Sequence, residues 1–155
     1  MLVTTVPFDL ARVVAHVHGH LGWLAVALLV HPAVVLRTRG RARAGIAVGL
    51  ATGLVSTTAA AGAWLYPVYR ERVKGELFAS APTVGWLFER KEHLAFGAVL
   101  LAWAGAAAYV GSRRADDEVQ RERLHVTSRR AFIAASALAF VTAVLGTVVA
   151  SYRAL

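Results

Sequence analysis

Residues 131–151 read AFIAASALAFVTAVLGTVVAS and carry no charged side chain. As an α-helix this stretch would be about 31 Å long, which matches the hydrocarbon core of a bilayer. Three more apolar stretches precede it, at about residues 13–36, 45–65 and 93–110. Backbone groups in lipid must be hydrogen bonded, and no stretch alternates between apolar and polar residues as a β-barrel strand does. We therefore predict four transmembrane helices.

The composition supports one membrane domain over residues 1–155. The chain is 57% hydrophobic and only 17% charged, and the charges lie between the apolar stretches. It has no cysteine, which excludes disulfides and thiolate metal ligands. Basic loops beside apolar spans explain the net charge of +8 through membrane topology and anionic lipid, so we do not expect nucleic acid as a partner.

The loops predict how the spans are arranged. Short connections favour an all-α, up-down-up-down four-helix bundle in the lipid bilayer. Pro67 should end the second helix. Ser80 and Pro82 resemble a helix start, so residues 82–92 should form a helical lead-in to the third span. Residues 116–130 have a composition that would extend the fourth helix.

Arginines predict the orientation. The first loop contains no acidic residue beside its arginines, and the loop between spans three and four contains six more, diluted by acids. The positive-inside rule places such loops in the cytoplasm. We predict a multi-pass protein of a bacterial-type inner membrane with both termini outside. The arginines concerned are Arg37, Arg39, Arg41, Arg43, Arg113, Arg114, Arg121, Arg123, Arg129 and Arg130.

Small residues four apart predict close helix packing. Gly45, Gly49 and Gly53 form one stripe on the second span, and alanines do the same on the third and fourth spans. We expect the glycines to pack inside the bundle. The alternative is that they face a second protein.

Histidines supply the candidate chemistry. His20 and His93 lie at the same predicted depth on spans one and three, near the outer face. Two histidines at one depth on different helices can hold the iron of a b-type haem. We expect these to be axial ligands, with Arg70 or Arg90 near the propionates. This predicts a redox or electron-transfer protein with a lipid quinone or a redox protein as partner.

Two other functions stay open. His16 with His20, and Glu89 with His93, are each four residues apart and share a helix face, and Glu92 is adjacent. These five residues could bind or transport a divalent metal ion such as zinc, iron or manganese. Alternatively, the chain carries no cofactor and is an accessory subunit of a larger membrane complex.

The other three histidines receive lesser roles. His18 lies about half a turn from His16 and His20 and should face lipid headgroups or loop. His31 precedes Pro32 and should hydrogen bond near the kink. His125 should lie outside the bilayer. The chain contains no phosphate-binding loop, Gly-x-Ser-x-Gly or His-Glu-x-x-His motif, so the sequence assigns no catalytic residue.

Overall fold

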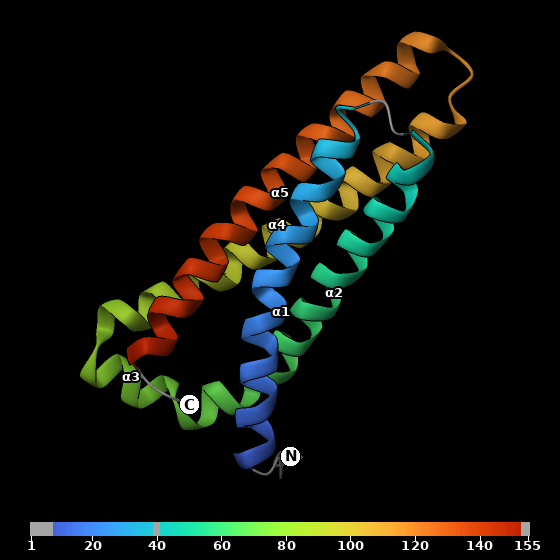
Figure 1. Ribbon diagram of the computed structural model, residues 1–155. Helices are drawn as coiled ribbons and strands as arrows, with labels where there is room; N and C mark the ends of the chain where they lie inside the picture. Colours follow the sequence, from blue (N-terminus) through green and yellow to red (C-terminus); the bar gives the residue numbers. More distant parts are fainter. Residues whose placement is uncertain (1–7, 39–40, 153–155) are drawn as a thin grey trace.

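The computed structural model describes residues 8–38 and 41–152. Within these residues the chain forms helices and no strand (Figure 1). The helices are α1 (Phe8–Val35), α2 (Arg41–Arg72), α3 (Lys74–Ser80), α4 (Pro82–Arg114) and α5 (Glu118–Tyr152). Arg39 and the two chain ends, which entered the predicted topology, lie outside the described residues.

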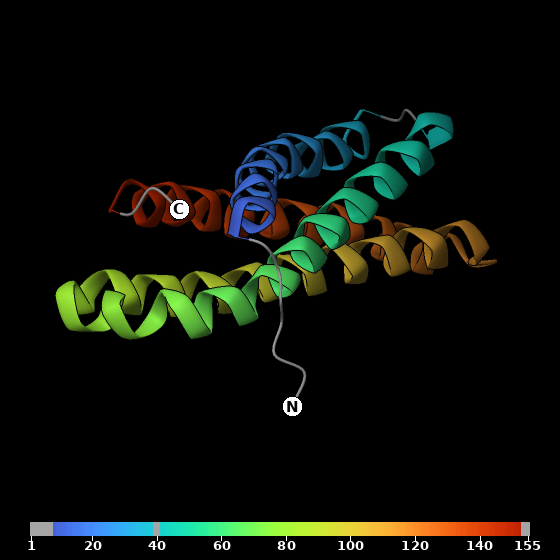
Figure 2. The same ribbon diagram turned by 90° about the horizontal axis from the view of Figure 1, so that it is seen from below.

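The predicted four-helix membrane bundle is confirmed. α1, α2, α4 and α5 are each long and apolar enough to cross a membrane. Around the bundle α1 contacts α2, α2 contacts α4, α4 contacts α5, and α5 contacts α1. Consecutive long helices are therefore neighbours, and α1 lies diagonally opposite α4. Figure 2 shows α2 running from the end of α1 across to α3 and α4.

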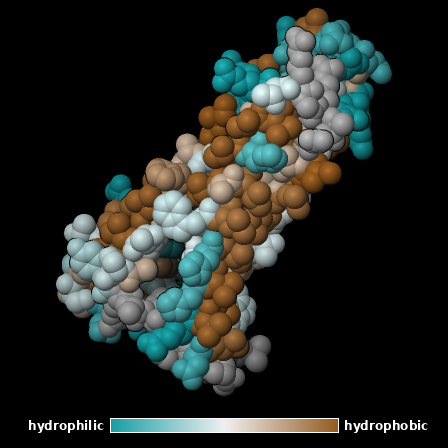
Figure 3. Space-filling view, in the orientation of Figure 1, coloured by the Kyte–Doolittle hydropathy of each residue, from teal (hydrophilic) through white to brown (hydrophobic). Residues whose placement is uncertain are grey.

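Hydropathy on the surface agrees with a membrane environment. Apolar side chains cover the middle of the molecule, and polar side chains gather mainly at its two ends (Figure 3). Large apolar residues are exposed on all four long helices, including Ile46 at 68% and Phe96 at 66%. In water such a surface would cause aggregation, whereas in a bilayer it contacts lipid.

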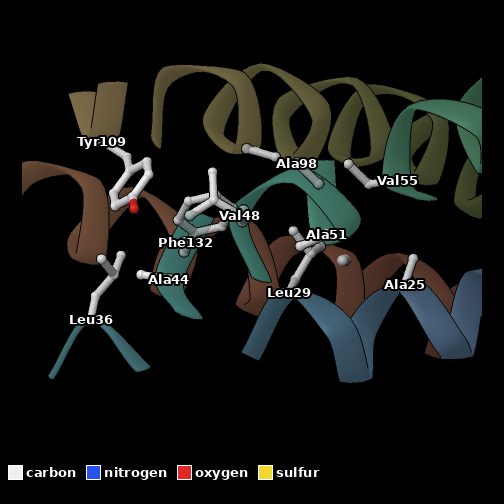
Figure 4. Close-up of a cluster of buried hydrophobic side chains, with 13 residues drawn as sticks. Ala25, Leu29, Leu36, Ala44, Val48, Ala51, Val55, Ala98, Tyr109 and Phe132 are labelled. Atoms are coloured by element: carbon white, nitrogen blue, oxygen red, sulfur yellow. The ribbon is translucent and has the colours of Figure 1, made fainter. Parts of the chain in front are cut away.

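The tightest part of the core lies where small residues let helices approach. Ala98, Ala102 and Ala135 are at most 1% exposed, and Phe132 is fully buried in the same core cluster, where it lies beside Val48 (Figure 4). Close packing of this kind holds membrane helices together, because lipid offers no hydrophobic drive for helix association. The predicted packing role of the alanines on spans three and four is thus confirmed.

The structure corrects the prediction for the glycine stripe on α2. Gly49 and Gly53 are exposed, and a Cβ atom built at either position would meet nothing within 4 Å. Only Gly45 has a close neighbour, the hydroxyl of Tyr109 at 3.3 Å. The prediction that this stripe packs inside the bundle was wrong, because the buried face of α2 carries Ala44, Ala47, Val48, Ala51 and Val55.

Helix boundaries differ from the sequence prediction in two places. Pro67 does not end α2, which continues to Arg72 and turns toward α3 in its last part (Figure 1). Ser80 is not the capping residue of α4, because it ends α3 and its hydroxyl donates to the carbonyl oxygen of Glu76. Pro82 does begin α4, and α4 and α5 both extend beyond a bilayer-length span as predicted.

The two ends of the bundle are built differently. At the arginine-rich end, α4 and α5 form a hairpin that projects past α1 and α2 (Figure 1). At the histidine-rich end, α1 diverges from α4 and α5, and α3 lies across the ends of α2 and α4 (Figure 1). Tyr69, Val73, Leu77 and Val84 form a separate small apolar cluster there. This end contains the residues considered next.

Candidate functional site

His18 is the histidine of α1 that faces the interior. Its Nδ1 lies 3.0 Å from the backbone carbonyl oxygen of Thr58 on α2. A Cβ atom at Gly62 would lie 3.0 Å from His18 Cε1, so the ring fits against a glycine. The expectation that His18 points to headgroups or loop was wrong. His16 and His20 point outward, and His18, which is about half a helical turn from each, points inward.

A carbonyl oxygen can only accept, so the Nδ1 of His18 donates this hydrogen bond. In the neutral imidazole the proton therefore sits on Nδ1, and Nε2 keeps its lone pair. His18 thus ties α1 to α2 at the histidine-rich end.

Lys91 and its neighbours form a polar cluster on α4. The Lys91 side chain is only 14% exposed, and its Nζ is 2.9 Å from Glu92 Oε1. Nζ also lies 4.1 Å from the ring centre of Phe88, which stacks on Tyr69 at 3.7 Å. The Tyr69 hydroxyl is buried, and no hydrogen-bond partner for it occurs among the described residues.

A second pair ties α3 to α4. Lys74 Nζ is 2.8 Å from Glu89 Oε1, so Glu89 pairs with Lys74 and not with Arg70. This bond to Glu89 raises the pKa of the Lys74 ammonium above its ordinary value. The cluster therefore contains two ion pairs, Lys74–Glu89 and Lys91–Glu92. Their glutamates lie within about a turn of each other on α4.

A pocket opens between α2 and α4 beside these pairs. It has a volume of about 310 Å³ and is lined by Ala63, Tyr66, Glu89, Glu92 and His93. His93 Nδ1 lies 2.8 Å from the carbonyl oxygen of Glu89, so it donates there. Neutral His93 therefore presents an unprotonated Nε2. The pocket combines an apolar groove with three groups that can accept protons.

His20 on α1 and His93 on α4, predicted as a ligand pair, are both exposed. Their helices lie diagonally across the bundle. His16 and His31 are exposed as well, with spacings that place them on the same face of α1 as His20. Among the described residues His31 has no hydrogen bond of the kind predicted at the kink, and Pro32 is buried.

The predicted metal ligands are also dispersed. Glu89, Glu92 and His93 share the pocket, but His16 and His20 are on another helix and face outward. Within residues 8–38 and 41–152, no three histidine or acidic side chains lie close enough to hold a metal ion. Arg70 and Arg90, predicted near the propionates, are exposed at this end.

Helix packing is looser at the histidine-rich end than in the middle of the bundle. A Cβ atom at Gly22 of α1 or at Gly146 of α5 would meet nothing within 4 Å, and both glycines are partly exposed. In the closed part of the bundle a Cβ atom at Gly105 would lie 2.9 Å from the Phe132 ring. Figure 3 shows the surface hollowed between α1 and the end of α5.

His18, Lys91 and Tyr69 were missed as site residues. α1 is apolar on nearly every face, so its sequence does not reveal which face is buried. In the structure Ala11, Ala25, Leu29 and Leu36 lie close in helical phase to His18, and all are buried. Lys91 was missed because charged residues flank it in the sequence.

Comparison with known proteins adds no relative. No protein-family model matches the chain, and no curated protein or solved structure is significantly similar to it.

Proposed function

We propose that this chain is a membrane redox protein that binds one b-type haem at the histidine-rich end and exchanges electrons with a lipid quinone. The observation that carries the proposal is an oriented imidazole and a largely buried cation at one end of an otherwise apolar bundle. Ionisable groups inside membrane bundles are costly and usually mark a functional site. Haem would supply one-electron chemistry there.

The pocket between α2 and α4 supports the quinone part of the proposal. Oxidation of a quinol to the quinone releases two electrons and two protons. One haem would take one electron at a time, so a redox partner protein would have to accept each electron before the next transfer. The protons need acceptors close to the ring hydroxyls. His93 Nε2 and the carboxylates of Glu89 and Glu92 line the pocket and can accept them. The isoprenoid tail of the quinone would remain in lipid.

The visible absorption spectrum tests haem binding. The protein is purified in detergent, titrated with hemin, and recorded oxidised and dithionite-reduced. We expect saturable binding of one haem per chain with a Soret band and defined reduced bands. A protein that stays colourless in excess hemin would disprove the proposal. Stoichiometric zinc, iron or manganese in that colourless protein would favour the metal-binding alternative, and its absence would favour an accessory subunit.

Quinone binding is tested separately in lipid nanodiscs. Decylubiquinone should quench the tryptophan fluorescence saturably, since Trp64 and Trp86 lie on α2 and α4 near the pocket in sequence. His93→Leu should weaken binding about tenfold, because a ring oxygen loses its partner (about 1.4 kcal/mol). His20→Leu is the matched control, as it removes an exposed histidine from α1. Equal affinity of wild type and His93→Leu would exclude this pocket.

A further inference from the structure

We propose that the arginine-rich end binds the phosphate of an anionic phospholipid beside the α1–α5 junction, the place where His125 of α5 meets Leu36 at the end of α1. Arg129 is the main contact of this phosphate, and Arg37 lies beside it. The junction is at the opposite end of the bundle from the pocket between α2 and α4 (Figure 1), so the site does not depend on the haem or quinone proposal.

The α1–α5 junction lies at the membrane boundary. His125 Nε2 donates a hydrogen bond of 2.8 Å to the carbonyl oxygen of Leu36. Leu36 ends the first apolar stretch and Arg37 follows it, while Arg129 comes just before the apolar stretch that begins at Ala131. Both arginines are therefore at the depth where the phosphates of lipid headgroups lie.

Arg129 lies on the side of α5 that faces α1. His125 is one turn before it, and Thr147, eighteen residues after it, is five turns away and in the same helical phase. His125 bonds to Leu36, and the Thr147 hydroxyl accepts from the indole N–H of Trp23 on α1 at 3.4 Å. The helical phase of α5 therefore directs Arg129 toward the α1–α5 junction.

The Nε–H of Arg129 has no hydrogen-bond partner in the part of the chain that the structure describes. The Nε atom is shielded from water, although the residue as a whole is only half-buried. A shielded donor without an acceptor costs free energy. Phosphate is a suitable acceptor, because a guanidinium presents Nε–H and a terminal N–H side by side to two phosphate oxygens. A lipid phosphate would therefore satisfy this donor.

The charge at this end favours an anion. The arginines whose side chains are described outnumber the acidic residues, and two of the acids are already engaged. Glu118 pairs with Arg121, and the Asp117 carboxylate accepts backbone N–H groups at the start of α5. Glu122 is two turns before Arg129, and no ion pair joins these two described residues. The residues compared are Arg37, Arg113, Arg114, Arg121, Arg123, Arg129 and Arg130 with Asp116, Asp117, Glu118 and Glu122.

The apolar surface beside the junction favours a phospholipid over dissolved phosphate. Val34 on α1 is 52% exposed, and Ile133, one turn after Arg129 on α5, is 53% exposed. Acyl chains would cover such side chains while the phosphate binds at the boundary above them. Anionic lipid is the expected class, because basic sites between membrane helices on the cytoplasmic side attract anionic headgroups.

The experiment measures lipid binding by native mass spectrometry of the protein in detergent. Wild type should bind phosphatidylglycerol about tenfold more tightly than phosphatidylcholine with the same acyl chains. Arg129→Gln should lose about tenfold in affinity for phosphatidylglycerol (about 1.4 kcal/mol). Arg129→Lys keeps the charge without the paired donors and should lose less. Arg123→Gln is the matched control, because it removes the same charge from an exposed position on another face of α5.

Three results would overturn the proposal. The first is equal affinity of wild type for the two lipids. The second is an equal loss in Arg129→Gln and Arg123→Gln, which would mean attraction by net charge without a site. The third is displacement of the lipid by inorganic phosphate at constant ionic strength, which would mean a site for dissolved phosphate. Circular dichroism shows whether Arg129→Gln keeps its helix content. If it does not, Arg129→Lys decides, and wild-type affinity in that variant would also reject the site.

Discussion

The ring of Phe132 on α5 lies against Gly105 on α4 so closely that a Cβ atom at position 105 would be 2.9 Å from it. One turn before Phe132, the Ser128 hydroxyl donates a hydrogen bond of 2.8 Å to the Gly105 carbonyl oxygen. Phe132 and Ser128 are both 0% exposed. This is a close approach of two backbones that requires glycine, and it joins the two helices that contact each other most extensively.

Gly105→Leu should therefore destabilise the bundle by about 1–3 kcal/mol or more, because the added side chain must push α4 and α5 apart. The measurement is unfolding in mixed detergent and SDS, followed by circular dichroism. Gly53→Leu is the matched control, since Gly53 is exposed with open space around it. Similar losses in both variants would mean that Gly53 has a packing partner, such as a second protein.

Gly62→Ala should disturb His18. The new methyl group would lie 3.0 Å from Cε1, so the ring must shift and weaken its bond to Thr58. Stability in mixed detergent and SDS should fall while helix content stays unchanged. Gly22→Ala is the matched control, because its methyl group would meet no atom within 4 Å. Equal stability of Gly62→Ala and wild type would show that the position of the His18 ring does not matter for packing.

His125→Ala should reduce stability by about 1 kcal/mol, the usual net value of a hydrogen bond. His125 Nε2 donates to the carbonyl oxygen of Leu36 at 2.8 Å and so ties α5 to the end of α1. The same unfolding assay measures the loss. His31→Ala removes an exposed histidine from α1 and should leave stability nearly unchanged. Hemin spectra should be unaffected by either substitution.

The Lys74–Glu89 pair should hold α3 on α4 over a defined pH range. The pKa of Lys74 is raised because the charged ammonium binds Glu89. A raised lysine pKa stabilises the folded form below the ordinary value, and the contribution is lost as pH rises through the raised value. Amide exchange of residues 74–80 should be faster in Lys74→Met at pH 8 than in wild type. No difference would show that the apolar cluster alone holds α3.

Orientation is tested with single cysteines, because the chain has none of its own. Ser80 and Thr127 are exposed at opposite ends of the bundle. In intact cells a membrane-impermeant thiol reagent should label Ser80→Cys, whereas Thr127→Cys should react only after permeabilisation. The reverse pattern would place the histidine-rich end and its pocket in the cytoplasm.

The fold class was accessible from sequence because length and hydropathy decide it. Each apolar stretch is long enough to cross a bilayer, and a helix satisfies its backbone without help from its neighbours. The long α4 and α5 also followed from local composition. Pro67 misled the prediction because a single missing backbone hydrogen bond does not end a helix that packs on others.

The candidate site could be predicted only in part from the sequence. Sequence placed Glu89, Glu92 and His93 at one level near the membrane boundary, and the structure gathers these three in one pocket. It could not choose between His18 and His20, since the choice depends on the rotation of α1 about its axis. The glycines of α2 were misassigned for the same reason.

The sequence by itself determined that four apolar helices cross the membrane and that four of the six histidines lie near one end. Only the tertiary structure decided that His18 points inward to Thr58 and that His16, His20 and His93 point outward. The physical reason is that hydropathy measures how much of a segment prefers lipid or protein over water. Lipid and a protein interior are similarly apolar, so the facing side of each helix is set by contacts with its neighbours.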